Sequence, residues 1–146
     1  MIEGPGLLQS LSGAWQLDRD IKAAGAQLRG EAIFEPEPDG AFGYRECGTL
    51  RLRDGRELSS HRRYTYRPSE RGFTVAFADG PAIGSDFVRL IFDALDGERL
   101  VADDVHHCGD DIYEVRYVLA LPSAFETVID VTGPAKAYRL ISSYVR

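Results

Sequence analysis

The sequence predicts an all-β domain, a single antiparallel up-and-down β-barrel of about nine or ten strands behind a short N-terminal helical turn. Helical periodicity is nearly absent, and short runs rich in Val, Ile, Tyr, Phe and Thr alternate with Gly, Pro and Asp. No gap between these runs provides the dozen or more residues that a parallel crossover needs. A flat sheet of so many strands would expose two edges, and closure into a barrel removes them.

The Gly, Pro and Asp residues between the runs locate the boundaries of the predicted elements. A helical turn is predicted at residues 6–12, and residues 20–26 could form a second one. Residues 36–40, 53–56, 68–72 and 95–97 have the Gly, Pro and Asp content of tight turns, and Asp54-Gly55 is the strongest hairpin signal. The predicted strands are residues 13–20, 27–35, 42–52, 57–67, 72–78, 86–92, 98–106, 112–121, 125–131 and 135–145.

Composition limits the class of protein. A chain of 146 residues with 44% hydrophobic and 27% charged residues is typical of one globular domain, here residues 1–146. The net charge of −6 argues against nucleic-acid binding, which requires a basic face. No segment resembles a membrane span or a secretory signal, and Cys47 and Cys108 are too few for a disulfide framework. We therefore expect a cytoplasmic protein that binds neither nucleic acid nor membranes, and leave a homodimer open.

Alternation along the strands indicates which side chains face inward. Each inward set is largely aromatic and aliphatic with one or two polar members, the pattern of a small barrel with a lined cavity. In residues 42–52, 57–67 and 135–145 these sets are Phe42, Tyr44, Glu46, Gly48, Leu50 and Leu52; Leu58, Ser60, Arg62, Tyr64 and Tyr66; and Tyr138, Leu140, Ser142 and Tyr144.

The start of the first strand carries a known motif. Gly13-Ala14-Trp15, after a short helical turn, resembles the Gly-x-Trp opening of lipocalins and other calycins. In that superfamily the Trp closes the base of the barrel, and a basic residue of the last strand lies across its ring. The resemblance therefore implies that Trp15 closes the barrel floor under Arg139 or Arg146, through a cation–π contact of about 0.5–2 kcal/mol.

A closer resemblance covers most of the chain. His106-His107-Cys108 with Asp111 and Tyr113, and Gly133-Pro134-Ala135-Lys136-Ala137-Tyr138, resemble the His-x-Cys-x-x-Asp-x-Tyr and Gly-Pro-x-Lys-x-Tyr blocks of a bacterial lipocalin-like family of unknown function. The resemblance implies the barrel fold and supplies no activity.

The first candidate site is His106, Cys108, Asp111 and Tyr113, which could converge at one barrel rim because each pair shares a strand face. The cluster could be a Cys–His nucleophile oriented by Asp111, a metal site, or part of a binding pocket. A metal site lacks the paired spacings of a dedicated zinc centre. A structural role is the other interpretation: Asp111 caps the turn, Cys108 and Tyr113 fill the core, and His106 binds a backbone carbonyl.

The second candidate is Glu46 with Arg62, both on the apolar face of their strands, where an unpaired charge is costly. Counting from the Asp54-Gly55 turn pairs Leu52 with Glu57 and puts Glu46 opposite Arg63. Matching the two apolar faces requires a one-residue bulge, which brings Arg62 to Glu46. The pair is then either a ligand anchor in the barrel interior or a hairpin salt bridge at an open end.

The third candidate is the last strand, where Lys136, Tyr138, Tyr144 and Arg146 share one phase. Lys136 could reach the barrel mouth, or it could be solvated beside core tyrosines. Tyr64, Tyr66 and Tyr117 are typical of aromatic barrel lining, which most often forms core.

We therefore predict a barrel that binds a small, partly apolar molecule in its interior. The alternatives are an enzyme acting through His106, Cys108 and Asp111, and a non-catalytic dimerisation or interaction module. No metal or cofactor is expected, although haem on an inward His106 stays open as a disfavoured variant. The predicted ligand-binding residues are Glu46, Arg62, Tyr64, His106, Cys108, Asp111, Tyr113, Lys136 and Tyr138.

Overall fold

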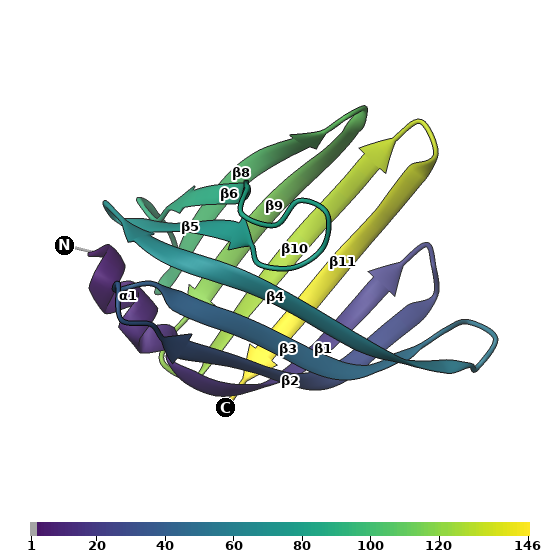
Figure 1. The fold of residues 1–146 in the computed structure, drawn as a ribbon, viewed down its shortest axis with the longest axis horizontal. Helices are drawn as coiled ribbons and strands as arrows, with labels where there is room; N and C mark the ends of the chain where they lie inside the picture. The colour runs from purple at the N-terminus through teal and green to yellow at the C-terminus, as the bar shows by residue number, and fades with distance from the viewer. Residues whose placement is uncertain (1–2) are drawn as a thin grey trace.

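The computed structural model describes residues 3–146, which form one helix and eleven strands (Figure 1). The ten predicted strands are all present, each within two residues at either end, and the short β7 was not predicted. The elements are α1 (Gly4–Leu11), β1 (Gly13–Lys22), β2 (Ala26–Pro36), β3 (Phe42–Arg51), β4 (Glu57–Ser69), β5 (Gly72–Phe77), β6 (Asp86–Ile91), β7 (Ala94–Asp96), β8 (Arg99–Cys108), β9 (Asp111–Ala120), β10 (Ala124–Gly133) and β11 (Lys136–Val145).

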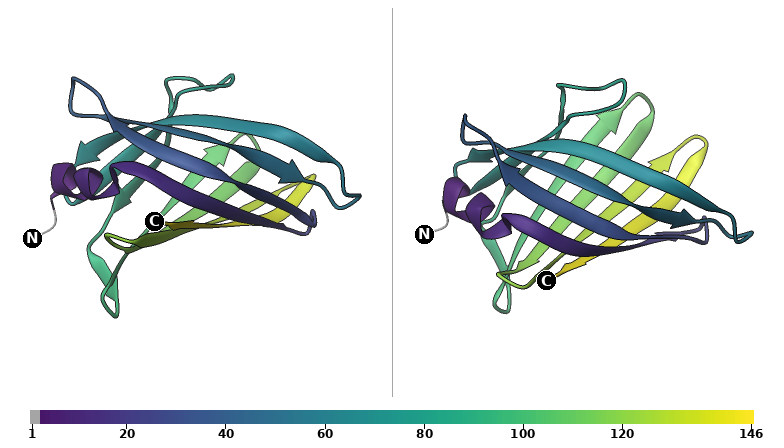
Figure 2. Two further views of the ribbon diagram at one scale, coloured as in Figure 1. Left: turned by 90° about the horizontal axis from the view of Figure 1, so that it is seen from below. Right: turned by 60° about the horizontal axis from the view of Figure 1, so that its bottom comes forward.

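The strands form one antiparallel sheet in the order β6-β5-β4-β3-β2-β1-β11-β10-β9-β8-β7. Two meanders, β1–β6 and β7–β11, are joined where the first strand pairs with the last, from Gln16 with Val145 to Lys22 with Arg139. The sheet curls so that the two meanders face each other as the walls of a half-barrel (Figure 2). The predicted all-β barrel class is therefore confirmed.

Closure of this barrel differs from the expectation. Within residues 3–146, β6 and β8 come close at the seam, but no backbone ladder joins them. Instead the backbone N–H of Arg89 donates a hydrogen bond of 2.7 Å to Oδ2 of Asp104. The expectation that closure removes both edges is wrong at this seam, because β6 ends at Ile91 and β7 takes the pairing edge of β8 from Arg99 to Val101.

Helix α1 covers one end of the barrel. Proline near its first turn suits a helix start because the missing N–H would lack an intrahelical partner anyway. The buried Leu7, Leu8 and Leu11 face β4 and β5. Gly4 approaches the sheet so closely that a Cβ there would lie 2.1 Å from the carbonyl oxygen of Ser69. The helix therefore acts as a plug for this end.

The possible second helical turn at residues 20–26 is wrong. These residues finish β1 and turn into β2, since Ile21 already pairs with Ala26. The turn requires left-handed backbone at Ala23, with φ of 75°, and at Gly25, with φ of 64°. Strand propagation and this turn replace the helical hydrogen bonds that a few residues could not sustain alone.

Trp15 closes the floor of the barrel beside α1. Its side chain is 1% exposed, and Nε1 donates a hydrogen bond of 2.9 Å to the carbonyl oxygen of Leu11. The guanidinium carbon of Arg146 lies 3.9 Å from the centroid of the indole ring. That guanidinium also donates hydrogen bonds to the carbonyl oxygens of Ser10, Ser12 and Pro122.

Arg139, the other arginine expected near Trp15, lies elsewhere. It forms two hydrogen bonds with Asp130, of 2.6 and 3.1 Å, across β10 and β11. Inward residues of β11 have even numbers, so position 139 points out of the barrel. The assignment of Arg139 to the barrel floor is therefore wrong.

No helix among the described residues is long and apolar enough to cross a bilayer.

The core fills the α1 end of the barrel, and fewer buried side chains lie toward the other end. The largest fully buried side chains are Trp15, Phe34, Phe73, Phe92, Leu8, Leu11, Leu17, Leu90 and Leu119. The opposite end, where the β1–β2, β3–β4 and β10–β11 hairpins turn, contains the space described next (Figure 1).

Candidate functional site

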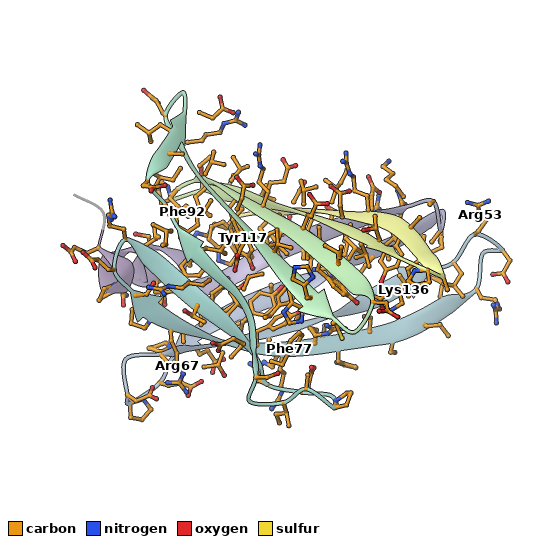
Figure 3. The ribbon with its side chains drawn as sticks, turned by 90° about the horizontal axis from the view of Figure 1, so that it is seen from above. Arg53, Arg67, Phe77, Phe92, Tyr117 and Lys136 are labelled. Carbon is orange, nitrogen blue, oxygen red and sulfur yellow. The ribbon has the colours of Figure 1, made fainter. Side chains whose placement is uncertain are left out.

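A cavity of about 430 Å³ lies at the hairpin end of the barrel. Both meanders contribute to its wall, for example Tyr44 of β3 and Tyr117 of β9, and Tyr117 is labelled in Figure 3. The lining residues are Arg19, Ile21, Ala24, Leu28, Tyr44, Glu46, Leu50, Ser60, His61, Arg62, Tyr64, Tyr66, Phe87, Tyr117, Thr127, Ile129, Tyr138, Leu140 and Tyr144.

A bidentate ion pair stands in the wall of this cavity. Nη1 and Nη2 of Arg19 lie 2.8 and 3.0 Å from the two carboxylate oxygens of Glu46. The side chains are 19% and 3% exposed, so both charges are largely removed from water. Arg19 lies opposite Leu28 and Glu46 opposite Ala32, so the pair reaches diagonally across β2. The ion pair therefore joins β1 to β3 over the strand that separates them.

Of the two registers considered for β3 and β4, the one that requires a bulge is observed. Glu46 does lie opposite Arg62. A three-residue loop sets this pairing: the N–H of Leu52 donates to the carbonyl of Arg56, the N–H of Gly55 donates to the carbonyl of Leu52, and Gly55 has a φ of 89°, as in a type I turn with a G1 bulge. The ion pair expected between Glu46 and Arg62 is wrong, since Glu46 binds Arg19 while Arg62 is exposed and lies toward the open end.

Two tyrosines extend the ion pair into a hydrogen-bonded network. Oη of Tyr44 donates to Oε1 of Glu46 at 2.6 Å and lies 2.8 Å from Oη of Tyr144. Nε of Arg19 donates to Oγ of Ser142 at 2.6 Å. Burial alone would raise the pKa of Glu46, but hydrogen bonds and charge from Arg19 outweigh it, so this pKa lies below its usual value. Glu46 is therefore a carboxylate with both oxygens occupied.

Burial acts in the opposite direction on the tyrosines. It raises the pKa of Tyr144 to about 12 and holds the pKa of Tyr44 well above its ordinary value. Each of these hydroxyls keeps its proton at neutral pH and can donate a hydrogen bond.

Arg62 and Tyr64 form the polar part of the mouth. Nη1 of Arg62 donates a hydrogen bond of 3.1 Å to Oη of Tyr64, and its guanidinium lies 5.8 Å from that ring. The Tyr64 ring stacks at 6.0 Å against Phe87, with 15° between the planes. Within residues 3–146, no carboxylate oxygen lies within 4.0 Å of the Arg62 guanidinium.

A second buried tyrosine pair lies on the cavity wall. Oη of Tyr66 and Oη of Tyr117 are 2.7 Å apart, and the two residues are 2% and 6% exposed. Burial holds the pKa of each hydroxyl well above its ordinary value, so both stay neutral.

The residues of the last strand occupy the rim. Nζ of Lys136 lies 3.0 Å from Oδ2 of Asp111, and Figure 3 shows Lys136 at the β10–β11 hairpin. Tyr138 lines the cavity, whereas Lys136, Asp111 and Tyr113 do not. Lys136 and Asp111 thus join two hairpins at the edge of the barrel, and their ligand-binding role stays a prediction.

Within the described part of the chain, the side chains of the predicted cluster, His106, Cys108 and Asp111, are not connected by hydrogen bonds. The His106 ring packs edge-on against Phe77, Phe87 and Tyr113, with centroids 5.2 to 5.9 Å away. Cys108 is exposed, so its expected place in the core is wrong: it is the last residue of β8, beside the turn into β9. No hydrogen bond joins the three side chains in the described chain, and no His, Cys, Asp or Glu group there could hold a metal ion.

The sequence reasoning missed Arg19, which orders the network. Its signal was the alternation of β1, where Trp15, Leu17, Arg19 and Ile21 share one face. An inward charge on an apolar strand face requires a partner, so this position could have been found by the reasoning applied to Glu46.

Comparisons with known proteins concern the fold and the family. Residues 11–146 match a family of unknown function (DUF6314). No curated protein matches the chain. Among solved structures, the S-type phycobiliprotein lyase CpeS of Guillardia theta is 12% identical, with a TM-score of 0.59, and the match covers 99% of this chain and 93% of that one.

Two designed proteins are also similar. A de novo fluorescence-activating β-barrel is 14% identical with a TM-score of 0.48, covering 95% of each chain. A redesigned β-barrel is 16% identical with a TM-score of 0.47, covering 100% of this chain and 96% of that one. At these identities the likeness to the lyase shows a shared barrel fold.

Proposed function

The chain belongs to the DUF6314 family of unknown function, and we propose that it binds a small, flat, partly apolar molecule in the cavity at the hairpin end of its barrel. The observation that carries the proposal is the cavity itself. Its volume of about 430 Å³ lies within the range of small-molecule pockets. Most of its wall is aromatic or aliphatic, with a few polar side chains to orient a ligand.

Structural demands alone explain this cavity poorly. A barrel interior without a ligand is normally filled by side chains, as it is at the α1 end of this one. An open space costs dispersion contacts that larger residues at Ala24 or Leu28 would supply. A ligand that fills the space restores those contacts.

The polar groups favour binding over chemistry. A general acid or base needs a pKa near the working pH and an atom free to reach the substrate. Glu46 has a lowered pKa and both oxygens engaged by Arg19 and Tyr44. His106 is outside the cavity lining. His61 belongs to the lining, but it is exposed and lies on the outward phase of β4.

The test combines an unbiased and a directed measurement. Native mass spectrometry of freshly purified protein detects any co-purified small molecule. Titration with prodan, a neutral naphthalene dye whose emission shifts to the blue in apolar surroundings, measures occupancy of the cavity. We expect saturable binding at one site.

Two tryptophan variants localise the binding. Leu140→Trp fills the cavity and should weaken prodan binding at least about tenfold, since the ligand must compete with the indole. Ile83→Trp adds the same ring at a position that is 65% exposed and should leave binding unchanged. Absence of saturable prodan binding, or equal affinity in both variants, would overturn the proposal.

A further inference from the structure

We infer that the ligand of this cavity is an aromatic acid, held with its anionic group toward Arg62 at the mouth and with a hydrogen-bond acceptor toward Tyr66 and Tyr117 at the inner end. This inference rests on the proposed function and names the chemical class of the ligand. Three features of the cavity carry it: its charge, its aromatic walls and the distribution of its hydroxyl protons.

The charges lining the cavity do not cancel. Arg19 and Glu46 neutralise each other in a bidentate pair. Arg62 is the remaining formal charge among the lining residues; within residues 3–146 no carboxylate oxygen lies within 4.0 Å of it, and the charges of Asp79 and Glu46 act on it from a greater distance. A planar guanidinium binds a carboxylate with two parallel hydrogen bonds, so the complementary ligand group is an anion and preferably a carboxylate.

Tyr64 adds a second donor for the same anion. Its hydroxyl oxygen accepts a hydrogen bond from Arg62, which leaves its own proton free to donate outward. Burial raises the pKa of Tyr64 despite the nearby Arg62 charge, so this proton is retained at neutral pH. Arg62 and Tyr64 thus form a clamp for an oxyanion at the cavity mouth.

Flat rings on the walls favour an aromatic body. Tyr64 stacks on Phe87, while Tyr44 lies 5.8 Å from Tyr64 and 5.6 Å from Tyr66, ring centroid to ring centroid. A planar ligand can pack against these faces in the offset or edge-on arrangements that aromatic pairs prefer.

The inner end of the cavity offers one free hydroxyl proton. Tyr66 and Tyr117 share a single hydrogen bond, so one hydroxyl donates to the other and the second proton has no acceptor among the described residues. In the network around Arg19 and Glu46, by contrast, each tyrosine hydroxyl proton has an acceptor. Tyr44 donates to Glu46, and Tyr144 can donate to Tyr44. A ligand carbonyl near Tyr66 and Tyr117 would accept the remaining proton.

The spacing of the two ends sets the size of the ligand. Arg62 and Tyr66 are four residues apart on β4, which separates their Cα atoms by roughly 13 Å. Part of that span is taken by the long side chain of Arg62. A fused two-ring acid with a carbonyl on its far side fits between the clamp and the tyrosine pair.

The experiment compares matched naphthalenes by isothermal titration calorimetry. The probe is 6-acetyl-2-naphthoate; its primary amide lacks the negative charge, and 6-isopropyl-2-naphthoate lacks the acceptor while keeping its shape. We expect the wild-type protein to bind the acetyl acid about tenfold more tightly than either analogue, the usual effect of one hydrogen bond to a charged or buried group.

Variants assign each preference to its residues. Arg62→Gln should abolish the preference for the acid over the amide and keep the preference for acetyl over isopropyl. Arg63→Gln is the matched control, an exposed arginine on the opposite strand face that should change neither.

The tyrosine pair makes a more specific prediction. Tyr66→Phe or Tyr117→Phe alone leaves one hydroxyl, whose proton stays available, so the preference for acetyl over isopropyl persists. The double variant removes both hydroxyls and should abolish it. Because both hydrogen-bond partners are replaced by rings of the same shape, this variant should fold, which urea unfolding followed by Trp15 fluorescence checks.

The possible results separate this inference from the proposed function. Prodan binding without any preference for the acid overturns the inference and leaves the proposed function standing. A preference for the acid that survives Arg62→Gln, or an acetyl preference that survives the double tyrosine variant, also overturns it. Failure of prodan and all three naphthalenes to bind overturns both.

Discussion

Replacing Glu46 by Leu while Arg19 remains leaves a guanidinium without its carboxylate in the interior of the barrel. Glu46 is 3% exposed and accepts three hydrogen bonds, two from Arg19 and one from Tyr44. Breaking one side of such a pair typically costs about 3–5 kcal/mol, because the remaining charge stays buried and uncompensated. Arg19, at 19% exposed, retains some contact with water, so we place the cost near the lower limit, about 3 kcal/mol.

Replacing Arg19 instead of Glu46 should lower the free energy of unfolding by a similar amount. The losses from the two single substitutions should not add in the double variant. Arg19→Met leaves the Glu46 carboxylate with Tyr44 as its remaining donor. The double variant removes both charges and substitutes apolar groups of similar volume, which can be nearly neutral. We therefore expect the cycle to yield a coupling energy of about 2 kcal/mol or more.

Urea unfolding followed by tryptophan fluorescence measures these free energies. Trp15, the single tryptophan of the chain, is 1% exposed and reports global unfolding. The matched control is the cycle on Arg116 and Asp103, which also form a bidentate pair but are each 57% exposed. For an exposed pair, coupling of about 0–1 kcal/mol is expected.

A coupling energy for Arg19 and Glu46 no larger than that of the surface pair would refute this reasoning. The buried pair also predicts acid sensitivity. Because the folded pKa of Glu46 is lowered, its contribution to stability is complete above about 4.5 and is lost as pH falls through the folded pKa. The charge-free double variant should lose less stability over that acid range than the wild type.

Three further predictions follow from the packing. Burial raises the pKa of Tyr144 to about 12, so absorbance at 295 nm should show this tyrosine ionising at a higher pH in the folded chain than in urea. Its contribution to folding stability is therefore present below about pH 10 and is lost as the pH rises toward 12. Arg146→Met should lower the free energy of unfolding by about 1–2 kcal/mol, and Arg139→Met by less than 1 kcal/mol; equal losses would contradict the cation–π contact. Gly30→Ala should cost more than about 3 kcal/mol, since its Cβ would lie 2.1 Å from the carbonyl oxygen of Cys47, whereas Gly40→Ala, with open space around it, should cost about 1 kcal/mol.

The strands were predictable because their signals are local. Alternation and turn chemistry depend on neighbouring residues, and they placed ten strands and the inward phase of β3, β4 and β11. The strand β7 was missed because three exposed residues carry no alternation that differs from a turn. The loop after Leu52 was misjudged by one residue, since Asp54-Gly55 suits both two- and three-residue hairpins.

Part of the candidate site was also predictable from phase. Glu46, Arg62, Tyr64 and Tyr138 were placed inward and do line the cavity. His106 and Cys108 do not line it: the His106 ring packs against Phe77, Phe87 and Tyr113, and Cys108 is exposed at the end of β8. The alternation of residues along a strand assigns each side chain to one face of the sheet, but it does not show how far the barrel interior extends along that strand.

The sequence by itself determined that this chain alternates into an antiparallel barrel with Trp15 at its floor and charged residues among its inward side chains. Only the tertiary structure decided which charges meet. Arg19 and Glu46 lie 27 residues apart on strands separated by β2, and they pair across that strand. That pairing leaves Arg62 without a carboxylate oxygen within 4.0 Å among the described residues. The pairing depends on the registers of β1, β2 and β3, which bring residues far apart in the sequence together and which no local pattern encodes.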